Sequence, residues 1–266
     1  MFQGFEQKYP EYEVITPHTN LKFTIRSLTT AEELKIKTSL TDKNTLTEIL
    51  NKTLYDCLVQ KPKVIDSFES FLSNLTLTDR EALFTGWYHC SYGNIVENIP
   101  VVCPSCGHNF TINYDLSIGG RFEPYSGKEL EILDKEVEVD LDVAPAKIVI
   151  KVPTMKDELE LTKSFFSENQ EDDILNMLLY TKKIYYFEPN DKSRKNPIPI
   201  DNIADTIFAL KSLVPRDRRK LRGAYADNFG KYGLWLEYNT KCINCGNSFT
   251  GEVGLLQYFF REVYTG

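Results

Sequence analysis

Two short cysteine pairs are the residues in this sequence whose spacing points most directly to chemistry. Cys103 and Cys106 lie in "CPSCGHNF" (103–110), and Cys242 and Cys245 lie in "CINCGNSF" (242–249). Cys-x-x-Cys followed by glycine is half of a structural zinc site, which needs four ligands in a tetrahedron. The second pair follows the first at an offset of 139 residues, outside the spacing of any compact zinc finger. We therefore predict one structural Zn²⁺ whose four thiolates are brought together by the fold.

Two other interpretations of these cysteines remain open. The hairpins could persist without a metal, or the pairs could be redox dithiols, although neither pair opens a helix after a central strand as thioredoxin-like chemistry needs. His108 follows the first pair, but Asn247 stands at the matching place in the second, so we expect an exposed loop histidine. Cys57 and Cys90 stand alone in apolar surroundings and are predicted to be buried core residues.

An internal duplication would explain the distance between the two halves of the site. Four pairs of segments match in the same order along the chain. They are 28–34 with 153–159 and 48–56 with 173–181 at an offset of 125, 79–83 with 217–221 at 138, and the cysteine pairs at 139. The offset grows mainly at the polar, proline-containing stretch 188–199, which is typical of a loop insertion. The alternative is two similar helix–hairpin modules that share only their turn chemistry.

The predicted fold class is α+β, with two tandem pseudo-repeats and one shared zinc-ribbon-like site. The predicted ranges are 1–120 for the first repeat, 121–142 for a linker that is partly strand, and 143–266 for the second repeat. Each repeat begins with a short alternating β segment, at 21–25 and at 146–152, and ends in the hairpin that carries its cysteine pair.

Between these ends, each repeat is predicted to contain about three helices. The first starts at a capping box, Thr30 with Glu33 in one repeat and Thr154 with Asp157 in the other. The second carries the shared Ile-Leu-Asn-x-x-Leu-Tyr face. The third covers roughly 66–92 in the first repeat and 201–228 in the second.

Composition narrows the class of function. The chain has 266 residues, is 42% apolar and carries a formal net charge of −7. This charge argues against broad nucleic-acid binding, which depends on Lys and Arg neutralising phosphates. No apolar run approaches the roughly 20 residues that span a bilayer, and the N-terminus lacks the pattern of a secretory signal. We therefore expect a soluble protein made in a reducing cytoplasm.

Motifs of catalysis are not found in the sequence. There is no Gly-rich phosphate loop, no His-Glu-x-x-His and no Gly-x-Ser-x-Gly. A site closed by four cysteines leaves no open position for a zinc-bound water, so the metal would be structural. One basic stretch stands out, "PRDRRKLRG" (215–223), with Arg216, Arg218, Arg219, Lys220 and Arg222. It is either a solvated helix start or a docking patch for an acidic partner or, less plausibly, RNA.

The segments "VVCPSCGHNFTINYDL" (101–116) and "LTLTDREALFTGWYHCSYGN" (75–94) resemble the T4-type phage baseplate hub family. The resemblance covers residues 15–118 well and 143–260 more loosely, and the second half has Ile243 where the first has Pro104. It implies a structural or assembly protein of a contractile tail baseplate, hub or wedge–hub connector, that binds other baseplate proteins. It further implies a virion location, with assembly in the host cytoplasm and no small-molecule substrate.

Two other classes of protein remain as alternatives. The first is a zinc-ribbon nucleic-acid-binding or transcription accessory protein, which would be favoured by Lys or Arg on the knuckles, where only Lys241 lies nearby. The second is an enzyme of an unrecognised type, which would need a deep pocket with convergent ionisable groups.

Overall fold

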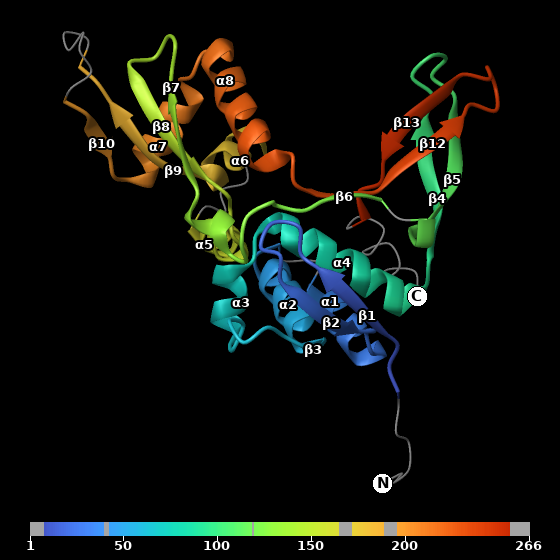
Figure 1. The fold of residues 1–266 in the computed structure, drawn as a ribbon. Helices are drawn as coiled ribbons and strands as arrows, with labels where there is room; N and C mark the ends of the chain where they lie inside the picture. The colour runs from blue at the N-terminus through green and yellow to red at the C-terminus, as the bar shows by residue number, and fades with distance from the viewer. Residues whose placement is uncertain (1–7, 40–42, 119, 165–171, 189–195, 256–266) are drawn as a thin grey trace.

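The computed structural model describes residues 8–39, 43–118, 120–164, 172–188 and 196–255. Within these ranges, eight α-helices and thirteen β-strands form a mixed α+β fold, as the sequence predicts. The chain is arranged as two lobes and an arm (Figure 1). The first lobe lies at the bottom of the view, the second lobe at the upper left, and the arm at the upper right.

The first lobe packs four helices against a three-stranded antiparallel sheet of order β1-β2-β3. Its strands are β1 (Glu11–Ile15), β2 (Lys22–Arg26) and β3 (Leu58–Gln60). Its helices are α1 (Thr30–Ser39), α2 (Lys43–Asp56), α3 (Phe68–Asn74) and α4 (Leu77–Tyr92). The central strand β2 and the long helix α4, which lies on β1 and β2, supply the fully buried Phe23, Ile25 and Trp87. The first core therefore lies between this sheet and α4.

The second lobe has a four-stranded antiparallel sheet of order β10-β9-β8-β7. Its strands are β7 (Glu136–Asp140), β8 (Ala146–Lys151), β9 (Thr181–Tyr186) and β10 (Ile198–Ile200). Its helices are α5 (Met155–Ser164), α6 (Asp172–Tyr180), α7 (Ile203–Lys211) and α8 (Pro215–Tyr225), the last continued by one π-helical turn, η3 (Ala226–Gly230). Ile148, Ile150, Leu210 and Leu221 are buried in its separate core.

The arm consists of two hairpins that come from opposite halves of the chain (Figure 1). One joins β4 (Ile95–Val102) to β5 (Asn109–Asp115), and the other joins β12 (Glu237–Lys241) to β13 (Ser248–Glu252). A short pair, β6 (Arg121–Glu123) with β11 (Gly233–Trp235), carries the chain between the arm and the second lobe. Of two 3₁₀ turns, η1 (Leu116–Ile118) precedes the passage through 121–142, and η2 (Glu131–Asp134) lies within it.

The elements of the two halves follow one order. Each half runs through two strands, two helices, a third strand, two more helices and a hairpin, and the second half adds β10 after β9 and η3 and β11 before its hairpin. Strands 21–25 and 146–152, predicted from alternation, correspond to β2 and β8, the second strands of the two sheets. The first strand of each sheet, β1 and β7, pairs antiparallel with them.

The prediction of a single third helix per half is wrong in both halves. The range 66–92 contains α3 and α4, and 201–228 contains α7, α8 and the start of η3. The chain is extended at Thr76 (φ −84°, ψ 168°) and at Val214 (φ −68°, ψ 157°), and each of these residues is the N-cap of a new helix. Pro215 then occupies the first turn of α8, where its missing N–H costs nothing.

The predicted capping box of α1 is also wrong, by one residue. The main-chain N–H of Thr29 donates to Glu32 at 2.9 Å, and the N–H of Glu32 donates to the Thr29 hydroxyl at 3.3 Å. The predicted box of α5 is present, because Thr154 N–H donates to Asp157 at 2.8 Å and Asp157 N–H donates back at 3.2 Å. The corrected pair stands at the same offset of 125 as the strands and helices around it.

A buried aspartate joins the last long helix of each lobe to the first hairpin of its sheet. Asp79 of α4 accepts hydrogen bonds from the main-chain N–H of His18 at 2.8 Å and of Thr19 at 3.3 Å. Asp217 of α8 accepts them from residues 142, 143 and 144, at 2.9, 3.1 and 2.8 Å. Both side chains are fully buried. Each carboxylate thus satisfies loop N–H groups that would otherwise be buried without partners.

Replacing Asp79 with Ala should lower the free energy of unfolding by about 3 kcal/mol, because buried N–H groups lose a charged acceptor. Urea unfolding measures the change. Glu97→Ala, an exposed carboxylate in β4, is the control and should stay within about 0.5 kcal/mol of the parent protein. Equal effects of the two substitutions would contradict the structural role of Asp79.

Candidate metal centre

Each cysteine pair forms the same tight turn at the tip of its hairpin. Cys103 N–H donates to the His108 carbonyl at 3.0 Å, and Gly107 N–H donates to the Cys103 carbonyl at 2.9 Å. In the second turn, Cys242 N–H donates to the Asn247 carbonyl at 2.8 Å, and Gly246 N–H donates to the Cys242 carbonyl at 2.9 Å. Gly107 and Gly246 have φ values of 71° and 74°, a region that glycine enters without steric cost.

The four thiols of the two turns meet in one cluster. The sulfur atoms of Cys103, Cys106, Cys242 and Cys245 all lie within 4.8 Å of one another. Cys103 Sγ is 3.7 Å from Cys245 Sγ, and Cys106 Sγ is 3.7 Å from Cys242 Sγ. These distances are far longer than a disulfide bond of about 2.0 Å. They match the edge, about 3.8 Å, of a tetrahedron with Zn–S bonds of about 2.3 Å. The cluster could therefore hold a metal ion of zinc's size and ligand preference.

The environment of the thiols favours an anionic cluster. The backbone N–H of His108 and the side chain of Asn244, whose Nδ2 is 3.7 Å from the sulfur, lower the pKa of Cys106 to about 6. The backbone N–H of Asn247 lowers the pKa of Cys245, but its hydrogen bond with Cys106 and partial desolvation outweigh this and raise that pKa to about 11. Ionisation of Cys106 thus opposes ionisation of Cys245, and a divalent cation would relieve this repulsion between thiolates.

Apolar contacts hold the stems of the two hairpins together below the cluster. Phe110 of β5 and Phe249 of β13 meet edge to face, with ring centroids 6.3 Å apart. They stand at equivalent places in the two hairpins, as do the buried Cys103 and Cys242. At the base, Tyr114 and Leu236 are buried against the first core. Side-chain burial alternates along β5, and Phe110 on its more buried face contacts the other hairpin.

The remaining cysteines and the first-turn histidine lie outside the cluster. Cys57 and Cys90 are buried, as predicted, and desolvation raises the pKa of Cys57 to about 12 and that of Cys90 to about 11. The ring of His108 stacks on Phe110 with centroids 6.1 Å apart. Among the described residues, the group that could hold a metal consists of the four knuckle cysteines. Asn244, which contacts Cys106, was not predicted, because an amide in a turn carries no ligand signal of its own.

The basic stretch 215–223, for which the sequence leaves a solvated helix start or a docking patch open, lies on α8. Some of its cations form ion pairs within the second lobe. Arg216 and Lys220 contact Asp142 at 2.9 and 2.5 Å, and Arg222 contacts Asp173 at 2.6 Å. Arg219 is exposed. Arg218 is half-buried, and its Nε has no hydrogen-bond partner among the described residues. Three of the five cations therefore also stabilise the lobe.

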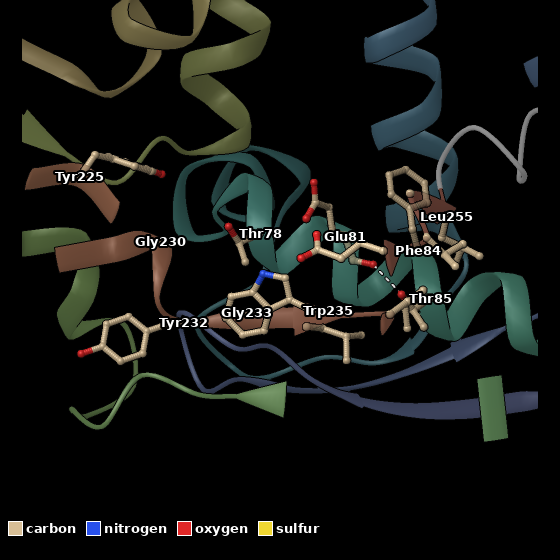
Figure 2. Close-up of a pocket in the computed structure, with 15 residues that line it drawn as sticks. Thr78, Glu81, Phe84, Thr85, Tyr225, Gly230, Tyr232, Gly233, Trp235 and Leu255 are labelled. Atoms are coloured by element: carbon tan, nitrogen blue, oxygen red, sulfur yellow. Dashed lines mark hydrogen bonds between the residues drawn. The ribbon is translucent and has the colours of Figure 1, made fainter. Parts of the chain in front are cut away.

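A pocket of about 720 Å³ lies between α4 and the segment from Tyr225 to Leu236 (Figure 2). Figure 2 shows Trp235 and Thr78 facing it, with the Thr85 hydroxyl donating to the Glu81 carbonyl at 3.0 Å. Its lining, within the part of the chain that the structure describes, includes two carboxylates, Glu81 and Glu252, but no histidine, cysteine, lysine or arginine. This lining holds no nucleophile with an adjacent basic side chain.

No helix in the described part of the chain is both long enough and apolar enough to cross a membrane.

The described chain thus consists of two α+β lobes and a paired-hairpin arm with four clustered thiols at its tip. The model of the family described as T4 bacteriophage base plate protein matches residues 9–193, well over half of the 266-residue chain, so the chain belongs to that family. No curated protein and no solved structure matches it. The matched range includes Cys103 and Cys106 and ends before Cys242 and Cys245.

Protein purified without a chelator should contain one zinc ion per chain by elemental analysis, because four thiolates at tetrahedral spacing favour that metal.

Replacing Cys242 with Ser should speed amide hydrogen exchange in the other hairpin, β4–β5, because metal binding is coupled to folding. Cys90→Ala, a buried thiol outside the cluster, is the matched control. If Cys242→Ser leaves β4–β5 as protected as the control does, the two hairpins do not share a metal.

Proposed function

We propose that this protein is a structural or assembly component of the phage tail baseplate, in the hub or at the connection between hub and wedge. It acts by binding other baseplate subunits, in the host cytoplasm during assembly and in the virion tail. The membership of residues 9–193 in the base plate protein family carries this proposal. The arrangement of two lobes on one arm supports it, because a chain with two similar bodies can bridge neighbours.

We propose that the two halves arose by tandem duplication, with the first repeat at 1–120, the linker at 121–142 and the second repeat at 143–266. The common order of elements supports this origin. So do matching details that simple turn chemistry does not require. Arg26 pairs with Glu32 at 2.6 Å, and Lys151 pairs with Asp157 at 2.7 Å, both at an offset of 125. Asp79 and Asp217 hold the first hairpins of their sheets in the same way.

The role we assign to the four knuckle cysteines is to hold a structural Zn²⁺ that joins the two repeats. Bound zinc would link the hairpin tips, which are exposed and have few apolar contacts, whereas Phe110 and Phe249 join the stems. With four protein ligands, the ion would have no open coordination position for a substrate or water. Its contribution is therefore mechanical. It keeps the second repeat fixed relative to the first.

We infer that the protein works by binding rather than by catalysis. The family is one of base plate proteins, and the described lining of the pocket beside α4 has no histidine, cysteine, lysine or arginine. The nucleic-acid alternative has little support, because the chain carries a net charge of −7 and Lys241 is the one cation close to the knuckles in sequence. The basic start of α8, at Arg216, Arg218, Arg219, Lys220 and Arg222, is the surface we assign to an acidic protein partner.

Deleting the gene from the parent phage should stall tail assembly, with normal heads and incomplete baseplates visible by electron microscopy. Complementation with the parent gene should restore tails, and a variant with all four knuckle cysteines changed to Ser should restore them poorly. A tagged copy should purify from infected cells with other baseplate subunits. Normal tails together with a defect confined to transcription would reject this function.

A further inference from the structure

The two lobes contact each other through helices that are not equivalent in the common order of elements. The start of α5, in the second lobe, lies against the start of α4, in the first. Met155 N–H donates to the Leu75 carbonyl at 2.9 Å, and Leu77 N–H donates to the Pro153 carbonyl at 3.2 Å. Met155 and Leu159 of α5 are buried in the core of the first lobe, with exposures of 0% and 7%. A contact of this kind, between two different faces of similar units, is heterologous.

One partly buried ion pair aligns this contact. Arg80 of α4 binds both carboxylate oxygens of Glu158 on α5, through Nη2 at 2.9 Å and through Nη1. Arg80 Nη1 also donates to Asn51 of α2 at 3.4 Å. A two-pronged arginine–carboxylate pair fixes both position and orientation. The start of α4 is thus an acceptor surface for an acidic helix start.

The start of α8 in the second lobe is the equivalent of this acceptor surface. Its arginine, Arg218, forms no ion pair with another described residue. Counting by the offsets of the matching segments, Arg218 of α8 stands where Arg80 does, and Asn176 of α6 stands where Asn51 does. Arg218 has no ion-pair partner among the described residues, although its Nε is buried. Val214 before it is 38% exposed, whereas its equivalent, Thr76, is fully buried under α5.

The first lobe correspondingly has, at the start of α1, an acidic helix start equivalent to that of α5. In the described chain it is not docked on an acceptor surface. Glu33 stands where Glu158 does, and Leu34 stands where Leu159 does. Leu159 is 7% exposed in the internal contact, but Leu34 is 53% exposed. Tyr92 donates to one carboxylate oxygen of Glu33 at 2.7 Å, which orients this side chain and leaves its other oxygen for a partner. Within the described residues, each copy of the chain therefore has one uncovered surface of each kind.

We propose that a second copy of this chain docks the start of its α1 on the start of α8, head to tail, in the manner of the internal α5–α4 contact. Glu33 of one copy binds Arg218 of the next, and Leu34 covers the apolar surface near Leu213 and Val214. The acidic first turn of α1, with Glu32 and Glu33, complements the basic α8. The proposal rests on the equivalence of the two halves, and it names the acidic partner of α8 within the proposed function.

Two sequence differences make this contact weaker than the internal one. Pro215 replaces Leu77 and has no N–H, so one of the two backbone hydrogen bonds cannot form. Thr30 replaces the buried Met155, so less apolar surface is covered. The expected association is reversible. Because a heterologous contact either closes into a ring or continues into an array, it suits a protein held at high local concentration in an assembly.

Sedimentation velocity of the full-length, zinc-loaded protein over a micromolar to submillimolar dilution series tests the proposal. The parent protein should associate as concentration rises. Arg218→Glu and Glu33→Arg should each weaken association about tenfold or more, because each places like charges face to face. The double variant with both changes should recover association. Lys128→Glu, the same change of charge at an exposed lysine outside both surfaces, should have little effect.

Leu34→Ser provides a second test that spares the fold, since this side chain is already 53% exposed in the single chain. It should weaken association with an unchanged thermal melt. A monomeric parent protein throughout the series would overturn the proposal, as would association that neither charge reversal affects. Binding of α8 to a different baseplate subunit without self-association would also overturn it, but would leave the baseplate function standing. Loss of that function would instead appear in the deletion phage.

Discussion

The constraint on which this structure depends is that a two-stranded hairpin cannot bury enough apolar surface to be stable alone in water. Each half of the chain ends in such a hairpin, and the two hairpins cover each other in the arm (Figure 1). For the two hairpins to meet, the chain that leaves α4 and the chain that leaves η3 must both run into the arm. The positions of the lobes follow from that requirement, as does the meeting of thiols that stand 139 residues apart.

The hairpins and the lobes are related in different ways. In the arm, Cys103 lies opposite Cys245 and Cys106 opposite Cys242, so the first ligand of each pair faces the second ligand of the other. This is the crossed pattern of a local twofold relation. Between the lobes, the start of α5 meets the start of α4, and no equivalent contact of α1 with α8 occurs within the described chain. The arm is a closed contact, whereas the contact between the lobes leaves one free surface at each end.

The chemistry of the described site and the family of the chain both support the proposed structural role. The thiol cluster satisfies the coordination number of a structural ion with protein ligands alone. The pocket beside α4 is lined by Phe84 from the first half and by tyrosine, tryptophan and leucine side chains from the second, without a cation in its described lining. Membership in the base plate protein family rests on residues 9–193, which include the sheet of the first lobe and strands β7, β8 and β9 of the second. The cysteines of the second hairpin lie beyond that match, so their role is argued from geometry.

Local patterns in the sequence were sufficient for the α+β class, for strands β2 and β8, for the second helix of each half and for the turn chemistry at Gly107 and Gly246. Each of these depends on residues a few positions apart, through alternation, helical spacing or a required φ above zero. The same patterns misplaced the α1 cap by one residue and merged α3 with α4, because Thr29 and Thr30 offer equal capping chemistry and Leu75 carries no helix-stopping signal.

The tertiary structure alone decided which distant groups meet. That Asp79 binds the loop at His18 and that Arg80 binds Glu158 could not be read from spacing, since partners 61 and 78 residues apart are selected by packing of the whole chain. The sequence specified the ligands and the turns. Their convergence depends on apolar burial in two lobes and an arm, a free energy to which no short segment contributes by itself.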